Sequence, residues 1–423
     1  MTTDVEVQYF SHLNGLVLGN NWGNLIRLLD KALVSGIDFP QITAASIDAQ
    51  GDLHITLFAA HNAMLFQVVE LSGFTPNSLN QKYRIKGVPN ATQLILKPKD
   101  SITGTTISVV GNGKLAPLGY DIIFRDVNDV KRVYRAKNPT AQHPFIRVDE
   151  STSDGVNSIN STYAKSAMVG LVENMTHIDD YENTDRLQLP IDTTDFKRNW
   201  KITGTGTNAI RGWSKWYFAC SQSMSNGPFD FDTPTAGNRN FTLLGDADAF
   251  YFQRSLTNTN TQNKLLSGCG LFNSALDNSI IPNWFLITTN KITNAGSTSG
   301  GFTNIPGGTP FSFNTSGSGF FVNHYDVAGR IKSNIIATPL IPDFFTGRSG
   351  LYNSNNLSAL EIPFYDDKKF LRGSLKHLYY SGNSRGVINP TTPLISDNSM
   401  FVMDSLWVNP DSGSTYFYLG EIE

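Results

Sequence analysis

The stretch MLFQVVELSGFTPNSLNQKYRIKGVPNATQLILKP, residues 64–98, carries the pattern from which we predict the fold of the first part of the chain. Three short runs of apolar and β-branched residues are separated here by Gly, Pro and Asn, which is the pattern of β-strands joined by turns. Similar runs lie at residues 52–60, 106–111 and 120–124. Six runs within about 75 residues predict a small β-barrel or sandwich.

One helix is predicted before these strands, in NNWGNLIRLLDKALVSG, residues 20–36. An asparagine at position 20 or 21 is suited to begin it, and Gly36 is suited to end it. We expect an N-terminal amphipathic helix over about residues 22–35 that covers an open face or edge of the small β-domain. Residues 1–130 are therefore predicted to be one docking domain. Five apolar residues recur on one helical face: Leu25, Leu28, Leu29, Ala32 and Leu33.

The remaining residues, 131–423, continue in the same β-like style. Aromatic and β-branched residues occupy strand positions, and Gly, Asn, Ser or Pro separate the runs. We expect a mainly β protein with a larger, all-β, sandwich-like distal region of one or two subdomains. Typical runs are KRVYRA (131–136), SKWYFACSQS (214–223), AFYFQRS (249–255), MFVMDSLWV (400–408) and TYFYLGEIE (415–423).

The composition narrows the possible partners. The chain has 423 residues, with 33 Lys and Arg against 36 Asp and Glu, and no cationic stretch that would neutralise a row of phosphates. Nucleic-acid binding is therefore disfavoured. Only 16% of the residues are charged, and a surface with few charges costs less to desolvate against a neighbouring protein. We find no secretory signal and no apolar run long enough to cross a bilayer, so membrane insertion is not expected.

Residues 294–319, NAGSTSGGFTNIPGGTPFSFNTSGSG, form the most biased segment. Such a composition buries little apolar surface, so we expect a long exposed loop or an arm that becomes ordered against a neighbouring subunit. The residues that we expect at this interface are Gly296, Gly300, Phe302, Pro310, Phe311 and Phe313.

Two motifs resemble catalytic or nucleotide-binding loops without their context. Gly113-Lys114 lacks the earlier glycine, the following Ser or Thr and the helix of a phosphate-binding loop, so we interpret Asn112-Gly113 as a hairpin turn. Residues 382–386, GNSRG, match the G-x-S-x-G pattern, but no helix and no later histidine follow. We therefore predict no catalytic residue and no cofactor site.

Metal and acid–base sites are also not indicated. The nearest metal-like fragment contains His177, Asp179 and Asp180, and a solvated acidic turn is the preferred interpretation. The pairs Asp230 and Asp232, and Asp246 and Asp248, offer too few oxygen ligands for calcium. Either pair could in principle supply the two carboxyl groups of a glycoside hydrolase. In a chain with 36 acidic residues, however, such a pair is weak evidence for that activity.

The two cysteines, Cys220 and Cys269, are expected to be reduced thiols. A single bridge would not make a disulfide scaffold in a chain of this length.

A cluster of aromatic residues offers the one alternative binding chemistry. Aromatic side chains at strand spacing are usually core residues, but exposed ones stack on sugars. We therefore note possible glycan contacts at Trp213, Trp216 and Tyr251, which lie near Trp200 and Tyr217.

The order of features over residues 68–252 resembles a family of tailed-bacteriophage tail and baseplate structural proteins. The matching stretches are VVELSGFTPNSLNQKYRIKGV (68–88), KLAPLGYDIIF (114–124), VYRAKNPTAQHPFIRVDES (133–151) and NFTLLGDADAFYF (240–252). The resemblance implies a small barrel followed by a β-rich domain, and a virion component made in the bacterial cytoplasm. It implies no catalytic residues.

Our leading hypothesis from the sequence is a non-enzymatic structural subunit of a phage tail or baseplate. It would contact other virion proteins and further copies of itself, with residues 294–319 as an interface arm. The alternative is a receptor-binding module of the tail tip that recognises a host surface glycan. A third, less favoured hypothesis is a polysaccharide-degrading enzyme.

Overall fold

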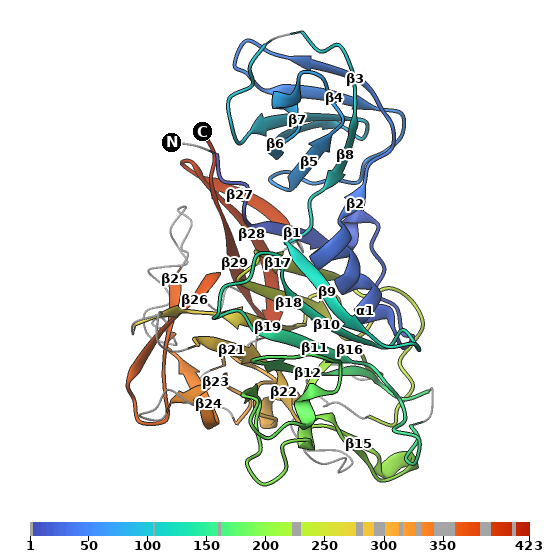
Figure 1. Cartoon of the computed structure of the whole chain (residues 1–423), viewed down its shortest axis with the longest axis vertical. Coiled ribbons are helices and arrows are strands. Elements are labelled where there is room, and N and C mark those ends of the chain that lie inside the picture. The colour runs from blue at the N-terminus through green and yellow to red at the C-terminus, as the bar shows by residue number, and fades with distance from the viewer. Residues whose placement is uncertain are drawn as a thin grey trace.

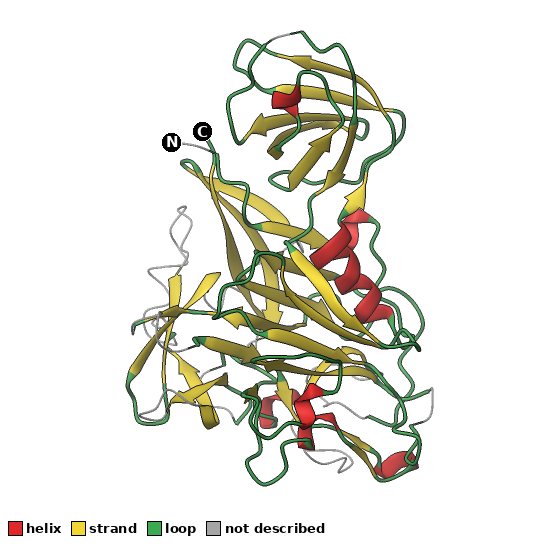
Figure 2. Cartoon of the chain, viewed as in Figure 1, coloured by secondary structure: helices red, strands yellow, loops and turns green. Residues whose placement is uncertain are grey.

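The computed structural model describes residues 3–104, 106–159, 162–221, 230–275, 282–291, 301–312, 316–325, 331–341, 360–380, 391–407 and 412–423. These residues form a mainly β protein with large curled sheets, which confirms the predicted fold class at this level. A small domain projects from a larger body (Figure 1), and strands dominate both (Figure 2).

The small domain is one curled antiparallel sheet in the order β2-β8-β5-β6-β7-β4-β3. Among its described residues β2 and β3 do not pair with each other, so the sheet stays open and the predicted barrel is not formed. The strands are β2 (Ile37–Asp38), β3 (Ile42–Ile47), β4 (Leu53–Leu57), β5 (Val68–Ser72), β6 (Lys82–Asn90), β7 (Gln93–Pro98) and β8 (Asn112–Leu115), with a 3-10 turn η3 (Asn77–Leu79) between β5 and β6.

The larger sheet of the body has the order β1-β17-β18-β19-β21-β23-β24-β25-β26-β29-β28-β27, and β20 pairs with β26. Its strands are β1 (Gln8–Ser11), β17 (Phe241–Gly245), β18 (Ala249–Ser255), β19 (Lys264–Leu271), β20 (Asn273–Ser274), β21 (Trp284–Ile287), β23 (Phe320–Tyr325), β24 (Ile331–Pro339), β25 (Leu360–Tyr365), β26 (Leu371–Tyr380), β27 (Thr392–Ser396), β28 (Ser399–Trp407) and β29 (Ser412–Glu421).

The second sheet of the body has the order β22-β16-β12-β11-β10-β9, and β13 pairs with β12. Its strands are β9 (Tyr120–Arg125), β10 (Lys131–Ala136), β11 (Phe145–Asp149), β12 (Lys165–Val172), β13 (Gln188–Leu189), β16 (Ser214–Ala219) and β22 (Thr289–Asn290). Beside it lie a two-stranded ribbon, β14 (Ile202–Thr203) and β15 (Ile210–Arg211), and the 3-10 turns η1 (His12–Asn14), η4 (Asp180–Glu182), η5 (Arg198–Trp200), η6 (Gly206–Asn208) and η7 (Gly301–Asn304).

The central strands of the larger sheet are buried on both faces. Leu243 and Phe250 belong to a hydrophobic cluster that includes Trp216 of the second sheet, whereas their neighbours Leu244 and Tyr251 belong to another cluster. Because successive side chains of a strand point to opposite faces, the sheet needs a cover on each side. The second sheet and the helix cover one face, and the curled continuation of the larger sheet through β26, β28 and β29 covers the other.

The helix is α1 (Asn24–Leu29), continued by the π-helical segment η2 (Asp30–Ser35), and Gly36 follows it with φ of 72°. Its predicted place at the N-terminus needs correction, because strand β1 precedes it. The helical segment η2 also packs against β9 of the body. Ile26, outside the predicted stripe, is fully buried as well, so the helix is covered on more than one side.

The first turn of the helix is held by a carboxylate from the distant end of β11. Glu150 Oε2 accepts a hydrogen bond from Gly23 N at 2.5 Å, and its Oε1 accepts one from Ile26 N at 2.7 Å. These are backbone donors that a helix start leaves without intrahelical partners. Burial raises the pKa of Glu150 to about 7, and the two backbone hydrogen bonds oppose that rise. This contact spans more than 120 residues, and no local pattern predicts it.

Replacement of Glu150 by glutamine is expected to change how stability depends on pH. A folded-state pKa of about 7, above the ordinary value of 4.5 for glutamate, means that the wild type keeps its full stability from this group below about pH 4.5. It loses up to about 3 kcal/mol as the pH rises to about 7. Urea unfolding at pH 5 and pH 7.5 checks this, since E150Q should lack that loss. Parallel pH curves for wild type and E150Q would contradict it, and the exposed Glu70→Gln provides the control.

The predicted domain boundary at residue 130 does not coincide with the observed organisation. Strand β1 pairs with β17, so the residues before β2 belong to the body. The β9–β10 hairpin lies within one sheet on both sides of residue 130. Residues 37–115 are thus a small domain inserted into the body, which the chain enters after Gly36 and leaves before Tyr120.

The pair Asn112-Gly113 lies in strand β8, so its interpretation as a hairpin turn is wrong. Gly113 pairs with Leu71, and a Cβ atom at position 113 would lie 2.8 Å from Leu71 Cδ2. Close packing against β5 therefore explains this glycine. The preceding run at residues 106–111 makes only one isolated bridge, between Val109 and Thr75.

Two buried polar side chains join the inserted domain to the body. Gln8 of β1 donates from Nε2 to the carbonyls of Val68 and Ala116, both at 2.8 Å. Arg84 of β6 donates to carbonyl oxygens of the N-terminal segment, of the loop before β5 and of β29: Asp4, Val7, Phe66 and Leu419. The two termini lie side by side in Figure 1, and Asp4 N donates to Glu421 O at 2.9 Å.

The segment predicted as an exposed arm is largely internal where it is described. Phe302 is fully buried and packs edge-to-face on Tyr217, with ring centroids 5.8 Å apart. Pro310 and Phe311 are buried too. The expectation of exposure therefore needs correction for these three residues, because their apolar side chains fill gaps within this chain. Gly296, Gly300 and Phe313 lie outside the described residues.

Candidate functional site

The aromatic residues proposed for glycan contact have different fates in the fold. Trp216 and Tyr251 have no exposed surface, so neither contacts a ligand in this fold and that prediction is wrong for both. They are core residues because β16 and β18 are covered on both faces. Trp213 differs, because it is only partly buried and lines a surface hollow.

This hollow, here called the Trp213 hollow, has a volume of about 390 Å³, which falls in the size range of small-ligand sites. In Figure 1 its strand β15 lies at the end of the molecule opposite the inserted domain. The lining residues are Asp192, Thr194, Asp195, Arg198, Lys201, Thr203, Ile210, Gly212 and Trp213.

The buried side chain of Asn199 organises the walls of the hollow. Its Nδ2 donates to Val169 O at 3.0 Å, which fixes it to β12. Its Oδ1 accepts hydrogen bonds from the backbone N of Trp213 and of Ser214. One amide therefore holds η5, which carries Arg198, against the segment that carries Trp213.

Gly212 allows the chain to turn beside this amide. It adopts φ of +54°, and a Cβ atom there would lie 2.1 Å from the carbonyl oxygen of Asn199. Its N donates to Lys201 O at 2.8 Å. A side chain at position 212 would therefore push Trp213 away from Arg198. The backbone of the hollow is fixed by these contacts.

The charges that line the hollow are paired with one another. Arg198 Nη1 donates to Asp192 Oδ2 at 2.6 Å, and Lys201 Nζ donates to Asp195 Oδ2 at 2.6 Å. The hydrogen bond from Arg198, together with that from Thr194, lowers the pKa of Asp192 well below its usual range. The Arg198 guanidinium also lies over the Trp213 ring, with Cζ 5.6 Å from the centroid. The hollow is thus polar without net charge.

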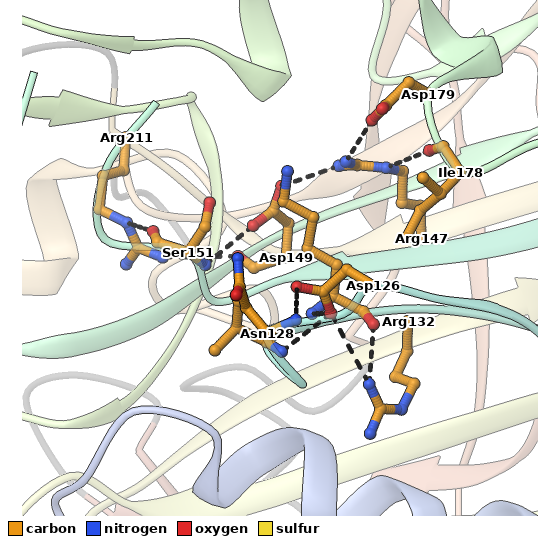
Figure 3. A network of polar contacts seen from close by, with 11 residues as sticks. Asp126, Asn128, Arg132, Arg147, Asp149, Ser151, Ile178, Asp179 and Arg211 are labelled. Atoms are coloured by element: carbon orange, nitrogen blue, oxygen red, sulfur yellow. Dashed lines mark hydrogen bonds and ion pairs between the residues drawn. The ribbon is translucent and has the colours of Figure 1, made fainter. Parts of the chain in front are cut away.

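The metal-like fragment around residue 177 is part of a structural network (Figure 3). Arg147 is fully buried and donates to Ile178 O at 2.9 Å and to Asp149 Oδ2 at 3.1 Å, and it pairs with Asp179 at 3.4 Å. Asp180 accepts hydrogen bonds from the backbone and the hydroxyl of Thr176. The acidic residues of this fragment therefore hold a loop against β11.

The Arg147 guanidinium lies between two aromatic rings. Its Cζ is 4.4 Å from the Tyr181 centroid and 4.5 Å from the Trp200 centroid. Trp200 is thereby buried in the structural network and is not a surface contact.

The first aspartate pair is divided between two environments. Asp230 is buried among cations, with Lys215 Nζ at 3.3 Å and Lys291 Nζ at 3.4 Å, and it accepts from Tyr217 Oη at 2.6 Å. Asp232 accepts from Ser221 Oγ at 3.2 Å. Burial alone would raise the pKa of Asp230, but the two lysines lower it. This pair stabilises the interior of the body.

The second aspartate pair joins three parts of the body. Asp248 contacts His143 Nε2 at 2.8 Å and the ammonium of Lys376, whereas Asp246 contacts His377 Nε2 at 2.8 Å. These hydrogen bonds, that of His143 first, lower the pKa of Asp248 far below its usual range. The arrangement binds the loop before β11 and strand β26 to the β17–β18 turn.

The remaining sequence features are possible metal ligands, the G-x-S-x-G pattern and the two cysteines. In the described parts of the chain no three His, Cys, Asp or Glu side chains are grouped as metal ligands. Residues 382–386, GNSRG, lie outside the described residues. Both cysteines are buried free thiols, as predicted. Burial raises the pKa of Cys220 to about 12.

Sequence reasoning found Trp213 and missed its polar partners. Asp192, Asp195, Arg198 and Lys201 all lie within IDTTDFKRNWK, residues 191–201. Only 16% of the residues in this chain are charged. The high density of charges of both signs close to Trp213 was therefore the local signal that could have indicated a polar site.

Comparisons with known proteins add little to these observations. No helix in the described part of the chain combines the length and apolar character that a membrane span requires. A scan against protein-family models finds no match, and a search of curated proteins finds no similar sequence. Among solved structures the chain is similar to the phage phi92 endosialidase, with 9% sequence identity and a TM-score of 0.15. The match covers 91% of this chain and 52% of that chain, so this chain spans about half the length of its neighbour.

Proposed function

We propose that this chain is a non-enzymatic structural subunit of a bacteriophage tail or baseplate. It is made in the bacterial cytoplasm and assembles into the virion with other tail proteins and further copies of itself. The proposal rests on the sequence resemblance over residues 68–252, and one observation on the fold supports it.

The segments that carry the resemblance meet in space. Gln8 of β1 binds the carbonyls of Val68 and Ala116, in the first and second segments. The same strand pairs with β17 of the fourth segment, where Gln8 lies opposite Gly245. Three of the four stretches thus meet around strand β1, as expected for parts of one folded unit.

Direct contacts link the remaining segments. Tyr120 of the second segment packs edge-to-face on Phe250 of the fourth, with centroids 5.7 Å apart. His143 of the third segment binds Asp248 of the fourth. The resembling region is therefore the junction between the inserted domain and the body.

The use of ionisable side chains also favours a scaffold. Asp179, Asp230, Asp246 and Asp248, which the sequence offered for chemistry, each bind a neighbouring structural element. Asp180 accepts hydrogen bonds from Thr176 within its own loop. A group already committed to several structural hydrogen bonds is poorly placed to act as a general acid or base.

Gene disruption in the phage that encodes this chain tests the proposal. We expect particles without complete tails, restored to infectivity by the wild-type gene supplied in trans, and we expect the chain in purified wild-type particles by mass spectrometry. Complete, infectious particles that lack the chain would refute the proposed role.

A further inference from the structure

We infer that the Trp213 hollow is a binding site for an uncharged saccharide. This inference goes beyond the proposed tail role and does not depend on it, because the purified chain alone can be tested. Three features of the hollow carry it: the balance of its charges, its remaining hydrogen-bonding capacity and its apolar wall.

The charge balance selects against ionic ligands. Asp192 and Asp195 are neutralised by Arg198 and Lys201 at 2.6 Å each. An anionic group that approached the two cations would be repelled by the carboxylates paired with them. A cationic group that approached the two carboxylates would be repelled by the paired cations. An uncharged ligand leaves both ion pairs intact and requires no unpaired charge to be desolvated.

The paired charges keep unused hydrogen-bonding positions next to one another. A carboxylate offers about four acceptor sites, a guanidinium five donors and an ammonium three. Asp192 accepts hydrogen bonds from Arg198, from the backbone N and hydroxyl of Thr194 and from the backbone N of Asp195, which fill its acceptor sites. Asp195 accepts only from Lys201 and from Lys197 N among the described residues, so it keeps acceptor sites, and the hydrogen bonds of Arg198 and Lys201 to the two carboxylates leave further donors on both cations. The hydroxyl of Thr203 adds a group that donates and accepts. A pair of neighbouring sugar hydroxyls, each a donor and an acceptor, matches such adjacent groups.

The other wall of the hollow is apolar. Trp213 and Ile210 line it, and the indole is held in place by Phe321, whose ring centroid is 5.9 Å away at an interplanar angle of 63°. A sugar ring presents carbon-bound hydrogens on one face and hydroxyls at its rim. The combination of a rigid aromatic with a few convergent polar groups is typical of small-ligand sites.

The hollow is built in advance of any ligand. Asn199 and Gly212 fix the backbone on both sides, and the ion pairs hold Arg198 and Lys201 toward their carboxylates. A preformed site loses little conformational entropy when a ligand binds. Strand β15, which contributes Ile210 to the hollow, lies at the end of the body opposite the inserted domain (Figure 1).

The test uses the purified full chain on an array that carries neutral, sialylated and sulfated glycans, followed by calorimetric titration with the best neutral oligosaccharide. Thr203→Tyr places a bulky side chain in the hollow from an exposed strand position and is expected to abolish binding. Lys201→Ala removes one donor from the exposed rim and is expected to weaken binding about tenfold.

The matched control is Lys99→Ala, which breaks a comparable exposed ion pair at 2.8 Å between Lys99 of the inserted domain and Glu6 of the N-terminal segment. It should bind like the wild type. Binding of a neutral glycan that is lost in T203Y, weakened in K201A and kept in K99A supports the inference. No neutral glycan bound by the folded chain, binding only of sialylated or sulfated glycans, or binding that persists in both T203Y and K201A would overturn it.

Discussion

Replacement of Lys264 by methionine is expected to lower the free energy of unfolding by about 3–5 kcal/mol, because it leaves the Asp404 carboxylate buried without its cation. Lys264 Nζ of β19 lies 2.6 Å and 2.8 Å from the two carboxylate oxygens of Asp404 on β28. Both side chains are 0% exposed. This pair links the central layer to the outer layer of the larger sheet, so the variant should also loosen β28 against β19.

Chemical denaturation of purified K264M measures this loss. The double variant K264M/D404N removes both charges and should recover at least half of it, since the carboxylate without its cation is the main cost. Lys99→Met breaks only an exposed pair and should change the free energy by less than about 1 kcal/mol. A free energy of unfolding for K264M within 1 kcal/mol of the wild type, on the scale of an exposed pair, would contradict this account of the layers.

Replacement of Arg84 by methionine is expected to cost about 4 kcal/mol or more, since three buried carbonyl oxygens and the partly buried one of Asp4 lose their donor. Each unsatisfied buried group costs about 1–3 kcal/mol. Arg84 is fully buried on β6. Burial lowers the pKa of Arg84 to about 10, so it remains charged at neutral pH. Its carbonyl partners belong to the N-terminal segment, to the loop before β5 and to β29.

The expected consequence of R84M is local as well as global. Loss of these contacts should free the inserted domain from the two termini, which limited proteolysis would detect as faster cleavage between the domain and the body. Arg27→Met, at an exposed helix position that donates only to Trp22 O at 3.2 Å, is the control and should have little effect. Unchanged stability together with unchanged cleavage in R84M would show that Arg84 does not join the parts.

Much of the strand content could be predicted from local pattern. Runs such as those at 249–255 and 400–408 became β18 and β28 because β-branched and aromatic residues between turn signals favour strands wherever the fold places them. The helix was predicted over about residues 22–35, and it is observed from Asn24 to Ser35. Strands and helices of this kind depend mainly on residues that are close together in the sequence, so they can be predicted from local pattern.

The layers could not be predicted, because they depend on pairs that are distant in sequence. Strand β1 pairs with β17 more than 200 residues later, and no local signal records that partner. The same missing information led to the misplaced boundary at residue 130 and to the assignment of the helix to the small domain. Burial of β18 on both faces likewise made Tyr251 a core residue, although its short aromatic run resembles an exposed one.

The candidate site was predictable only in part. Trp213 was predicted because it belongs to a cluster of aromatic residues in the sequence, and exposed aromatic side chains stack on sugars. The hollow itself depends on Asn199 and on the positive φ of Gly212, which are tertiary features. Charge density in residues 191–201 was the one local sign of the polar wall.

A cryo-EM map of the native phage particle would show whether this chain is a structural subunit of the tail or baseplate. We expect density for the layered body and its inserted domain within the tail or baseplate, in contact with neighbouring chains and placed in repeated copies. A map that accounts for the whole tail and baseplate with other proteins, and leaves no density for this chain, would contradict it.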